Sequence, residues 1–116
     1  MFDVESIICP RQENSMARFI PPEEVVSPQR RWSLIKILFD PKKPDDSVLA
    51  LGRWDNRPVL AMRWNGSTEN PIGNPQSRGL PVWYIVHHRY YGPIIKTLSP
   101  DMQTLARNFL PEFDEG

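Results

Sequence analysis

The chain has 116 residues, of which 40% are hydrophobic and 24% are charged, as is typical of a single soluble globular domain. Its thirteen prolines are about twice the usual share, and most of them fall in segments expected to be loops. No uncharged apolar run approaches the roughly 18 residues that span a bilayer, and the start lacks the basic and apolar regions of a signal peptide. We therefore expect no membrane segment, and the single cysteine, Cys9, favours a reducing compartment, so we expect a cytoplasmic location.

The formal net charge is zero, but the charges are unevenly distributed along the chain. Residues 28–96 contain eleven basic and five acidic residues, whereas residues 1–27 and 97–116 each have three more acidic than basic residues. A basic middle section can bind anions, although a solvated surface of mixed charge would give the same counts. Cys9 is the only cysteine, so neither an internal disulfide nor a cysteine-rich metal site can form.

The N-terminal segment, residues 1–30, contains four prolines and shows no sustained helix or strand period. We expect it to form an irregular arm, followed by one domain at residues 31–111 and an acidic tail at residues 112–116. A short turn is expected near Pro22, because acidic residues follow it and suit the positive N-terminal end of a helical turn.

Three strands are predicted in the first half of the domain. Residues 31–39 are rich in aromatic and β-branched side chains, which favour strands. Residues 47–54 and 57–64 are also predicted to be strands, and they flank Asp55-Asn56, a pair that tolerates the positive φ angles of a tight turn. These two segments therefore predict a β-hairpin.

The two-residue turn also fixes the register of the predicted hairpin. Leu51 then lies opposite Leu60, and Leu49 lies opposite Met62, all on one face of the sheet. The other face carries mostly small residues, which would allow another layer to approach closely. These residues are Ala50, Gly52, Val59 and Ala61.

The second half of the domain predicts one more strand at residues 82–86 and then two helices. Apolar residues recur at helical spacing after Pro93, and a second helix is expected to begin at Ser99-Pro100 and to end before Pro111. The sequence as a whole predicts an α+β fold, in which an antiparallel sheet of about four strands has two C-terminal helices packed on one face.

Residues 65–81 form a long segment with neither a helix nor a strand period. Loops of this length are uncommon in compact domains and are usually functional or disordered. Within it, Ser77-Arg78-Gly79 can hold a phosphate or carboxylate through backbone N–H groups and a guanidinium. A self-packed loop whose polar groups satisfy one another is the alternative. The candidate binding residues are Arg63, Asn65, Asn74, Gln76, Ser77, Arg78 and His87.

Arginine and tryptophan recur side by side in the sequence, which suggests an alternative binding surface. The pairs Arg31-Trp32, Arg53-Trp54 and Arg63-Trp64 combine a cation with an aromatic ring, as nucleic-acid surfaces do. Adjacent strand residues point to opposite faces, however, so tryptophan in the core with arginine outside, or a cation–π contact across strands, is favoured.

His87 with Ser77 is a weak catalytic candidate, because no carboxylate that would orient the histidine can be identified. The adjacent His87 and His88 make a poor metal site. We therefore expect no metal and no cofactor.

Four segments resemble a pattern found in small uncharacterised bacterial proteins, some of which are similar to cargo of mobile DNA such as phages or integron cassettes. They are Gly52-x-Trp54, Pro58-Val59-Leu60-Ala61-Met62-Arg63-Trp64-Asn65-Gly66, Gly73-Asn74-Pro75-Gln76-Ser77-Arg78-Gly79 and Pro81-x-Trp83. The resemblance covers roughly residues 32–98 and implies a compact bacterial accessory domain. It implies no activity and no catalytic residue.

From these patterns we expect a small non-enzymatic binding module that uses residues 65–81 to bind a protein or an anionic ligand. One alternative is a nucleic-acid-binding protein that uses the basic residues 28–96, and another is a small hydrolase or nuclease. A homodimer is a further expectation, because residues 32–39 would invite pairing between chains if they formed the edge of the sheet.

Overall fold

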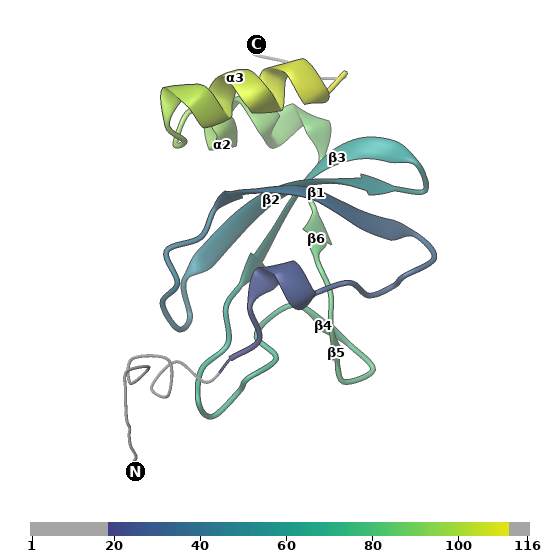
Figure 1. Ribbon diagram of the computed structural model, residues 1–116, viewed down its shortest axis with the longest axis vertical. Helices are drawn as coiled ribbons and strands as arrows, with labels where there is room; N and C mark the ends of the chain where they lie inside the picture. Colours follow the sequence, from purple (N-terminus) through teal and green to yellow (C-terminus); the bar gives the residue numbers. More distant parts are fainter. Residues whose placement is uncertain (1–18, 112–116) are drawn as a thin grey trace.

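The computed structural model describes residues 19–111 and confirms the expected α+β fold, a four-stranded antiparallel sheet with two short C-terminal helices (Figure 1). The strand order is β1-β2-β3-β6. The four strands are β1 (Trp32–Phe39), β2 (Ser47–Trp54), β3 (Arg57–Trp64) and β6 (Tyr84–Ile85). The fourth strand is thus shorter than the predicted residues 82–86. The predicted acidic tail and the first part of the predicted arm lie outside the described residues.

The hairpin of β2 and β3 has the register that its turn predicts. Leu51 pairs with Leu60 and Leu49 pairs with Met62. Asp55 and Asn56 have φ angles of 52° and 69°, so the two turn residues adopt the left-handed conformation that a tight hairpin requires.

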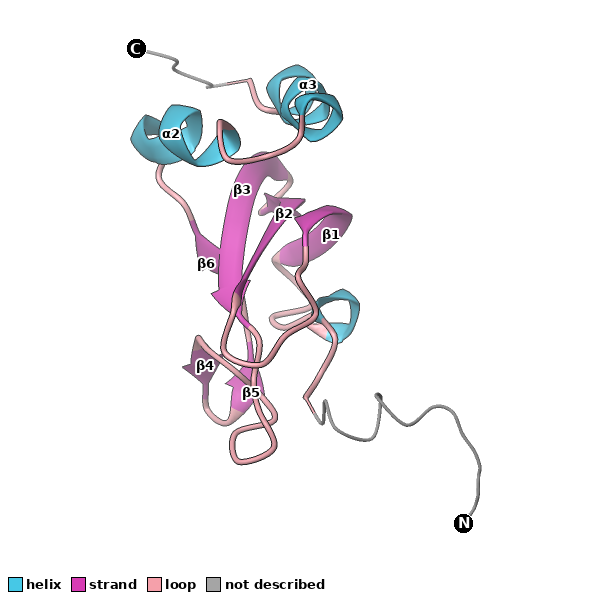
Figure 2. Cartoon of the chain, turned by 90° about the vertical axis from the view of Figure 1, so that its left-hand side faces the viewer, coloured by secondary structure: helices cyan, strands magenta, loops and turns pink. Residues whose placement is uncertain are grey.

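One face of the sheet is covered by α2 (Tyr91–Ile95) and α3 (Pro100–Phe109), which lie side by side on it (Figure 2). The hydroxyl of Ser99 accepts a hydrogen bond from the N–H of Met102, as expected for the cap of α3. α2 begins two residues before Pro93, after a short 3₁₀ turn, η2, at His88–Tyr90. The core between helices and sheet is formed by Leu38, Leu49, Leu51, Leu60, Val86, Tyr91, Ile95, Leu98, Ala106 and Leu110.

The opposite face of the sheet carries a second core, built around two tryptophans. The rings of Trp32 and Trp83 stack with their centroids 5.5 Å apart. A Cβ atom on Gly52 would lie only 2.2 Å from the ring of Trp32, so the small residues of this face do allow a close approach. The members of this core are Val25, Trp32, Val48, Ala50, Val59, Ala61 and Trp83.

The described part of the N-terminal arm contributes to this second core. The arm forms a 3₁₀ turn, η1, at Pro22–Glu24, where the sequence predicts a turn. Val25 follows and is fully buried, and its carbonyl oxygen accepts a hydrogen bond of 2.9 Å from the indole N–H of Trp83. An irregular segment that contributes a few single residues to a core has no period, and for this reason the pattern did not reveal it.

The long segment at residues 65–81 contains a small hairpin of its own, formed by β4 (Gln76–Ser77) and β5 (Leu80–Pro81). Arg78 and Gly79 form its turn, with φ angles of 54° and 79°. The hairpin lies at the end of the molecule away from the helices (Figures 1 and 2). Within the described part of the chain, none of the helices has the length and apolar character needed to span a membrane.

Candidate functional site

Arg63 fixes the long loop to the sheet from inside the protein. Its side chain is 1% exposed, and its guanidinium donates one hydrogen bond of 2.6 Å to the carbonyl oxygen of Val82 and another to that of Ile72. Burial lowers the pKa of Arg63 to about 10, so the group stays charged at neutral pH. A cation held inside by two carbonyl oxygens positions the loop, and its burial leaves almost none of the predicted binding residue Arg63 at the surface.

The burial of Arg63 also reverses the expected arrangement of the Arg63-Trp64 pair, in which the tryptophan lies inside and the arginine outside. Because neighbouring strand residues point to opposite faces, Trp64 is turned outward and is 44% exposed. The other pairs follow the expectation more closely. Trp32 is buried while Arg31 is exposed, and Arg31 lies 5.9 Å from the ring of Trp54, a cation–π contact between neighbouring strand ends.

Two amide side chains of the loop donate hydrogen bonds within the protein. Asn65 is buried and donates to the carbonyl oxygen of Lys43. The side-chain amide of Gln76 donates to the carbonyl oxygen of Gly73 and to the side chain of Asn70. The hydrogen bonds of Gln76 match the self-packed alternative, whereas Asn65 bonds outside the loop and its Oδ1 atom has no hydrogen-bond partner among the described residues. Asn65, like Arg63, is buried in this structure.

Asn74 is exposed, but its backbone is occupied. Its N–H donates to the carbonyl oxygen of Trp64, and its own carbonyl oxygen accepts from the N–H of Trp64. These two hydrogen bonds join the loop to the end of β3. The groups that remain free to meet a ligand are concentrated further on, at the turn of the β4–β5 hairpin.

Ser77 and Arg78 are exposed beside the N-terminal arm, with which they form a groove of about 660 Å³. Ser27 of the arm forms a parallel bridge with Val82, so the two walls are joined at the base. This volume lies in the range of pockets that bind small molecules. We call the site the arginine groove; it is lined by Ser27, Pro28, Gln29, Arg30, Arg31, Ser77, Arg78, Leu80 and Val82.

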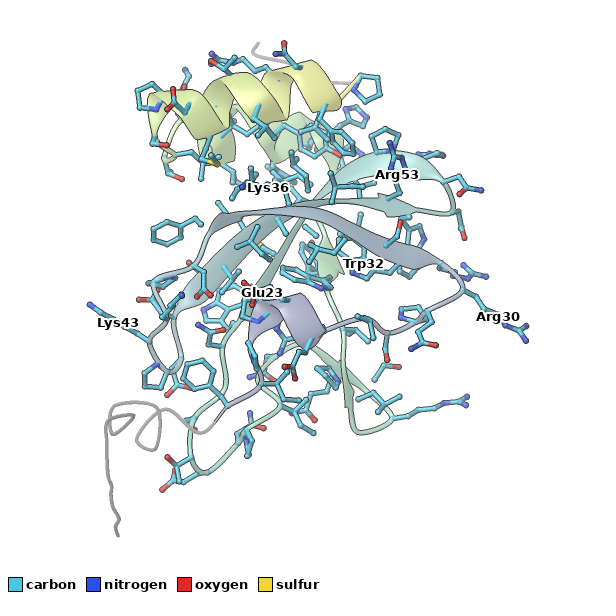
Figure 3. All side chains as sticks on the ribbon, viewed as in Figure 1. Glu23, Arg30, Trp32, Lys36, Lys43 and Arg53 are labelled. Carbon is cyan, nitrogen blue, oxygen red and sulfur yellow. The ribbon has the colours of Figure 1, made fainter. Side chains whose placement is uncertain are left out.

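The arginine groove has a positive lining, with three arginines and no acidic residue. Arg31 forms an exposed ion pair with Asp55, outside the groove, at 3.6 Å. Arg30 and Arg78 have no acidic partner among residues 19–111. Figure 3 shows Arg30 extending from the end of the arm away from the fold. Two guanidinium groups, one on each wall, are thus available to an anion.

His87 lies apart from the arginine groove. Its Nδ1 atom accepts a hydrogen bond of 3.1 Å from the N–H of Arg89, and its ring stacks on that of His88 with centroids 4.3 Å apart. His87 lines a different hollow, formed with Arg57 and Tyr84, so the structure does not bring it together with Ser77. Within residues 19–111, no group of histidine, cysteine and acidic side chains is arranged to hold a metal ion.

The arm residues of the groove, Ser27–Arg31, were absent from the predicted site. Their one signal in the sequence is the pair Arg30-Arg31 in an irregular, proline-containing segment. Their position beside the hairpin depends on the Ser27–Val82 bridge, which the sequence pattern does not show. Comparisons of the chain with protein-family models, curated proteins and solved structures found no match.

Proposed function

We propose that the protein is a small non-enzymatic binding module that holds an anionic ligand, or an anionic part of a partner protein, in the arginine groove. The observation that carries this proposal is the pair of guanidinium groups, Arg30 and Arg78, on opposite walls of a groove without acidic residues. Planar guanidinium groups bind carboxylates and phosphates through paired hydrogen bonds, so both classes of anion fit.

Hydrogen bonds hold both walls of the arginine groove in place, which favours binding. Arg63 holds the loop that carries one wall, and the Trp83–Val25 hydrogen bond holds the arm that carries the other. Walls that are fixed before binding lower the entropy lost when a ligand binds. Because His87 lies outside the groove, the site offers Ser77 no general base, and we propose no catalytic step. A cytoplasmic, bacterial accessory protein remains part of this proposal.

Nucleic acid is the second candidate, since three arginines also suit a phosphate backbone. Single strands bind proteins largely by stacking bases on aromatic rings, and the arginine groove is lined by none. The exposed aromatic residues of the described chain do not line it; they are Phe39, Trp64, Tyr84 and Tyr90. The groove is therefore better suited to a carboxylate or a small phosphate than to a nucleic-acid strand.

The predicted homodimer through β1 stays a prediction. β1 does lie at the edge of the sheet, as that prediction requires. However, its pairing with β2 has two irregularities, and Lys36 lies in mid-strand. Both features reduce pairing between edge strands. Light scattering at micromolar concentrations distinguishes the outcomes, and a monomer mass would exclude the dimer.

The proposed function is tested by calorimetric titration with inorganic pyrophosphate at low salt. The variants are Arg30→Ala and Arg78→Asn, the latter because asparagine tolerates the positive φ angle of this turn position. Each variant should weaken binding at least about fivefold, since a charge-assisted hydrogen bond contributes about 1.5–3 kcal/mol before solvent weakens it. Arg89→Ala, which removes an exposed arginine outside the groove, is the matched control and should bind normally. Equal binding by all four proteins would refute the proposal.

A further inference from the structure

A second hollow of about 360 Å³ adjoins the arginine groove. The two hollows share Gln29, Arg30 and Arg31, so the arm forms a common wall between them. The second hollow ends at Asp55 and Asn56, the turn of the β2–β3 hairpin. A single small anion occupies one of the two hollows, whereas an extended chain that crosses the arm at the three shared residues can contact both.

The floor of the arginine groove is apolar, which adds a second requirement for its occupant. Leu80 is 54% exposed on this surface, and Pro28 and Val82 line the groove with it. Burying an exposed leucine against an apolar group is favourable by roughly 25 cal/mol per Å². A ligand that combines an apolar side chain with neighbouring anionic groups would therefore use both the floor and the arginines.

The lack of exposed aromatic rings in the two hollows favours a peptide over a nucleic acid as their occupant. Trp32 is the only aromatic residue that lines either hollow, and it is buried against Trp83. No ring is thus presented for bases to stack on. Ser27, Ser77 and Gln29 instead offer the hydrogen-bonding groups that suit a peptide backbone.

Given the proposed function, on which this step rests, we infer that the occupant of the arginine groove is an extended acidic segment of a partner protein with an apolar side chain among its carboxylates. The carboxylates lie at the Arg30 and Arg78 end, and the apolar side chain lies on Leu80. At the far end the segment is neutral, because Asp55 there is already paired with Arg31 and would repel a further carboxylate.

The test uses three fluorescently labelled peptides and the full chain at low salt. The first peptide contains Glu-Leu-Asp-Glu, the second has serine in place of leucine, and the third has glutamine and asparagine in place of the acidic residues. Fluorescence anisotropy should show the first peptide binding at least about fivefold more tightly than either of the others. Leu80→Ser should remove the preference for leucine over serine, while Arg78→Asn should reduce the preference for the acidic peptide, because Arg30 remains.

Each result separates this inference from the proposed function. If pyrophosphate binds through Arg30 and Arg78 but the first two peptides bind equally to the unmodified protein, the inference is wrong and the proposed function stands. If neither pyrophosphate nor any peptide binds, both fail. If oligothymidine binds more tightly than the acidic peptide, with affinity that falls steeply as salt rises, the occupant is a nucleic acid and the inference is overturned. Circular dichroism of Leu80→Ser checks folding, and the half-exposed position of Leu80 predicts no change.

Discussion

Replacing Trp83 with phenylalanine tests whether the N-terminal arm is held in place as the structure indicates. The indole N–H of Trp83 donates a hydrogen bond to the carbonyl oxygen of Val25, and Val25 is fully buried. Phenylalanine retains an aromatic ring on Trp32 but cannot donate this hydrogen bond. The substitution therefore removes one hydrogen bond that holds the arm while it keeps an aromatic ring at this position.

The magnitude follows from two contributions. A buried carbonyl oxygen that loses its donor costs about 1–3 kcal/mol. The smaller ring buries a few tens of Å² less apolar surface, which adds about 1 kcal/mol at about 25 cal/mol per Å². We expect Trp83→Phe to lower the free energy of unfolding by about 2–4 kcal/mol, a large share of the roughly 5–15 kcal/mol typical of domains.

Urea denaturation followed by circular dichroism measures this loss. With an m-value of about 2 kcal/mol per M, the midpoint should fall by about 1–2 M. Trp64→Phe makes the same chemical change at a half-exposed tryptophan, and it should lower the free energy of unfolding by less than about 0.5 kcal/mol. Equal effects of the two substitutions would show that the arm is not fixed through Trp83.

Two further substitutions test the supports of the loop and of the second core. Arg63→Lys keeps the buried charge but cannot reach both carbonyl oxygens with a planar fork, so we expect a loss of about 1–3 kcal/mol in urea denaturation and weaker pyrophosphate binding. Unchanged stability would mean that the fork does not hold the loop. Gly52→Ala places a Cβ atom 2.2 Å from the ring of Trp32 and 2.8 Å from the carbonyl oxygen of Ser33. It should cost about 1–3 kcal/mol and alter the near-ultraviolet circular dichroism of the tryptophans, and a spectrum like that of the unmodified protein would contradict the tight packing.

The elements that the sequence predicts well are those fixed by local chemistry. The register of the β2–β3 hairpin follows from Asp55-Asn56 and the alternation of apolar residues, and Ser99 marks the start of α3. The layer on Gly52 was also expected, because small residues permit close approach, although the pattern did not identify Trp32 as the group that approaches.

The parts of the site that the sequence did not predict depend on contacts between distant residues. Strand alternation requires Arg63 and Trp64 to face opposite sides, but it does not say which of them is buried. That choice depends on the carbonyl oxygens of Ile72 and Val82, which accept hydrogen bonds from the guanidinium of Arg63. Likewise, Arg30 and Arg78 line the same groove because the Ser27–Val82 bridge brings the arm beside the β4–β5 hairpin.

The position of the bound anion tests the central claim most directly. Nuclear magnetic resonance of the ¹⁵N-labelled protein, titrated with inorganic pyrophosphate at low salt, reports which amide groups are perturbed. We predict that the largest shifts occur at residues 29–31 and 77–79, on the two walls of the arginine groove, with little change at residues 87–89. Shifts centred on residues 87–89, or spread evenly over all exposed basic residues, would contradict the assignment of the groove as the binding site.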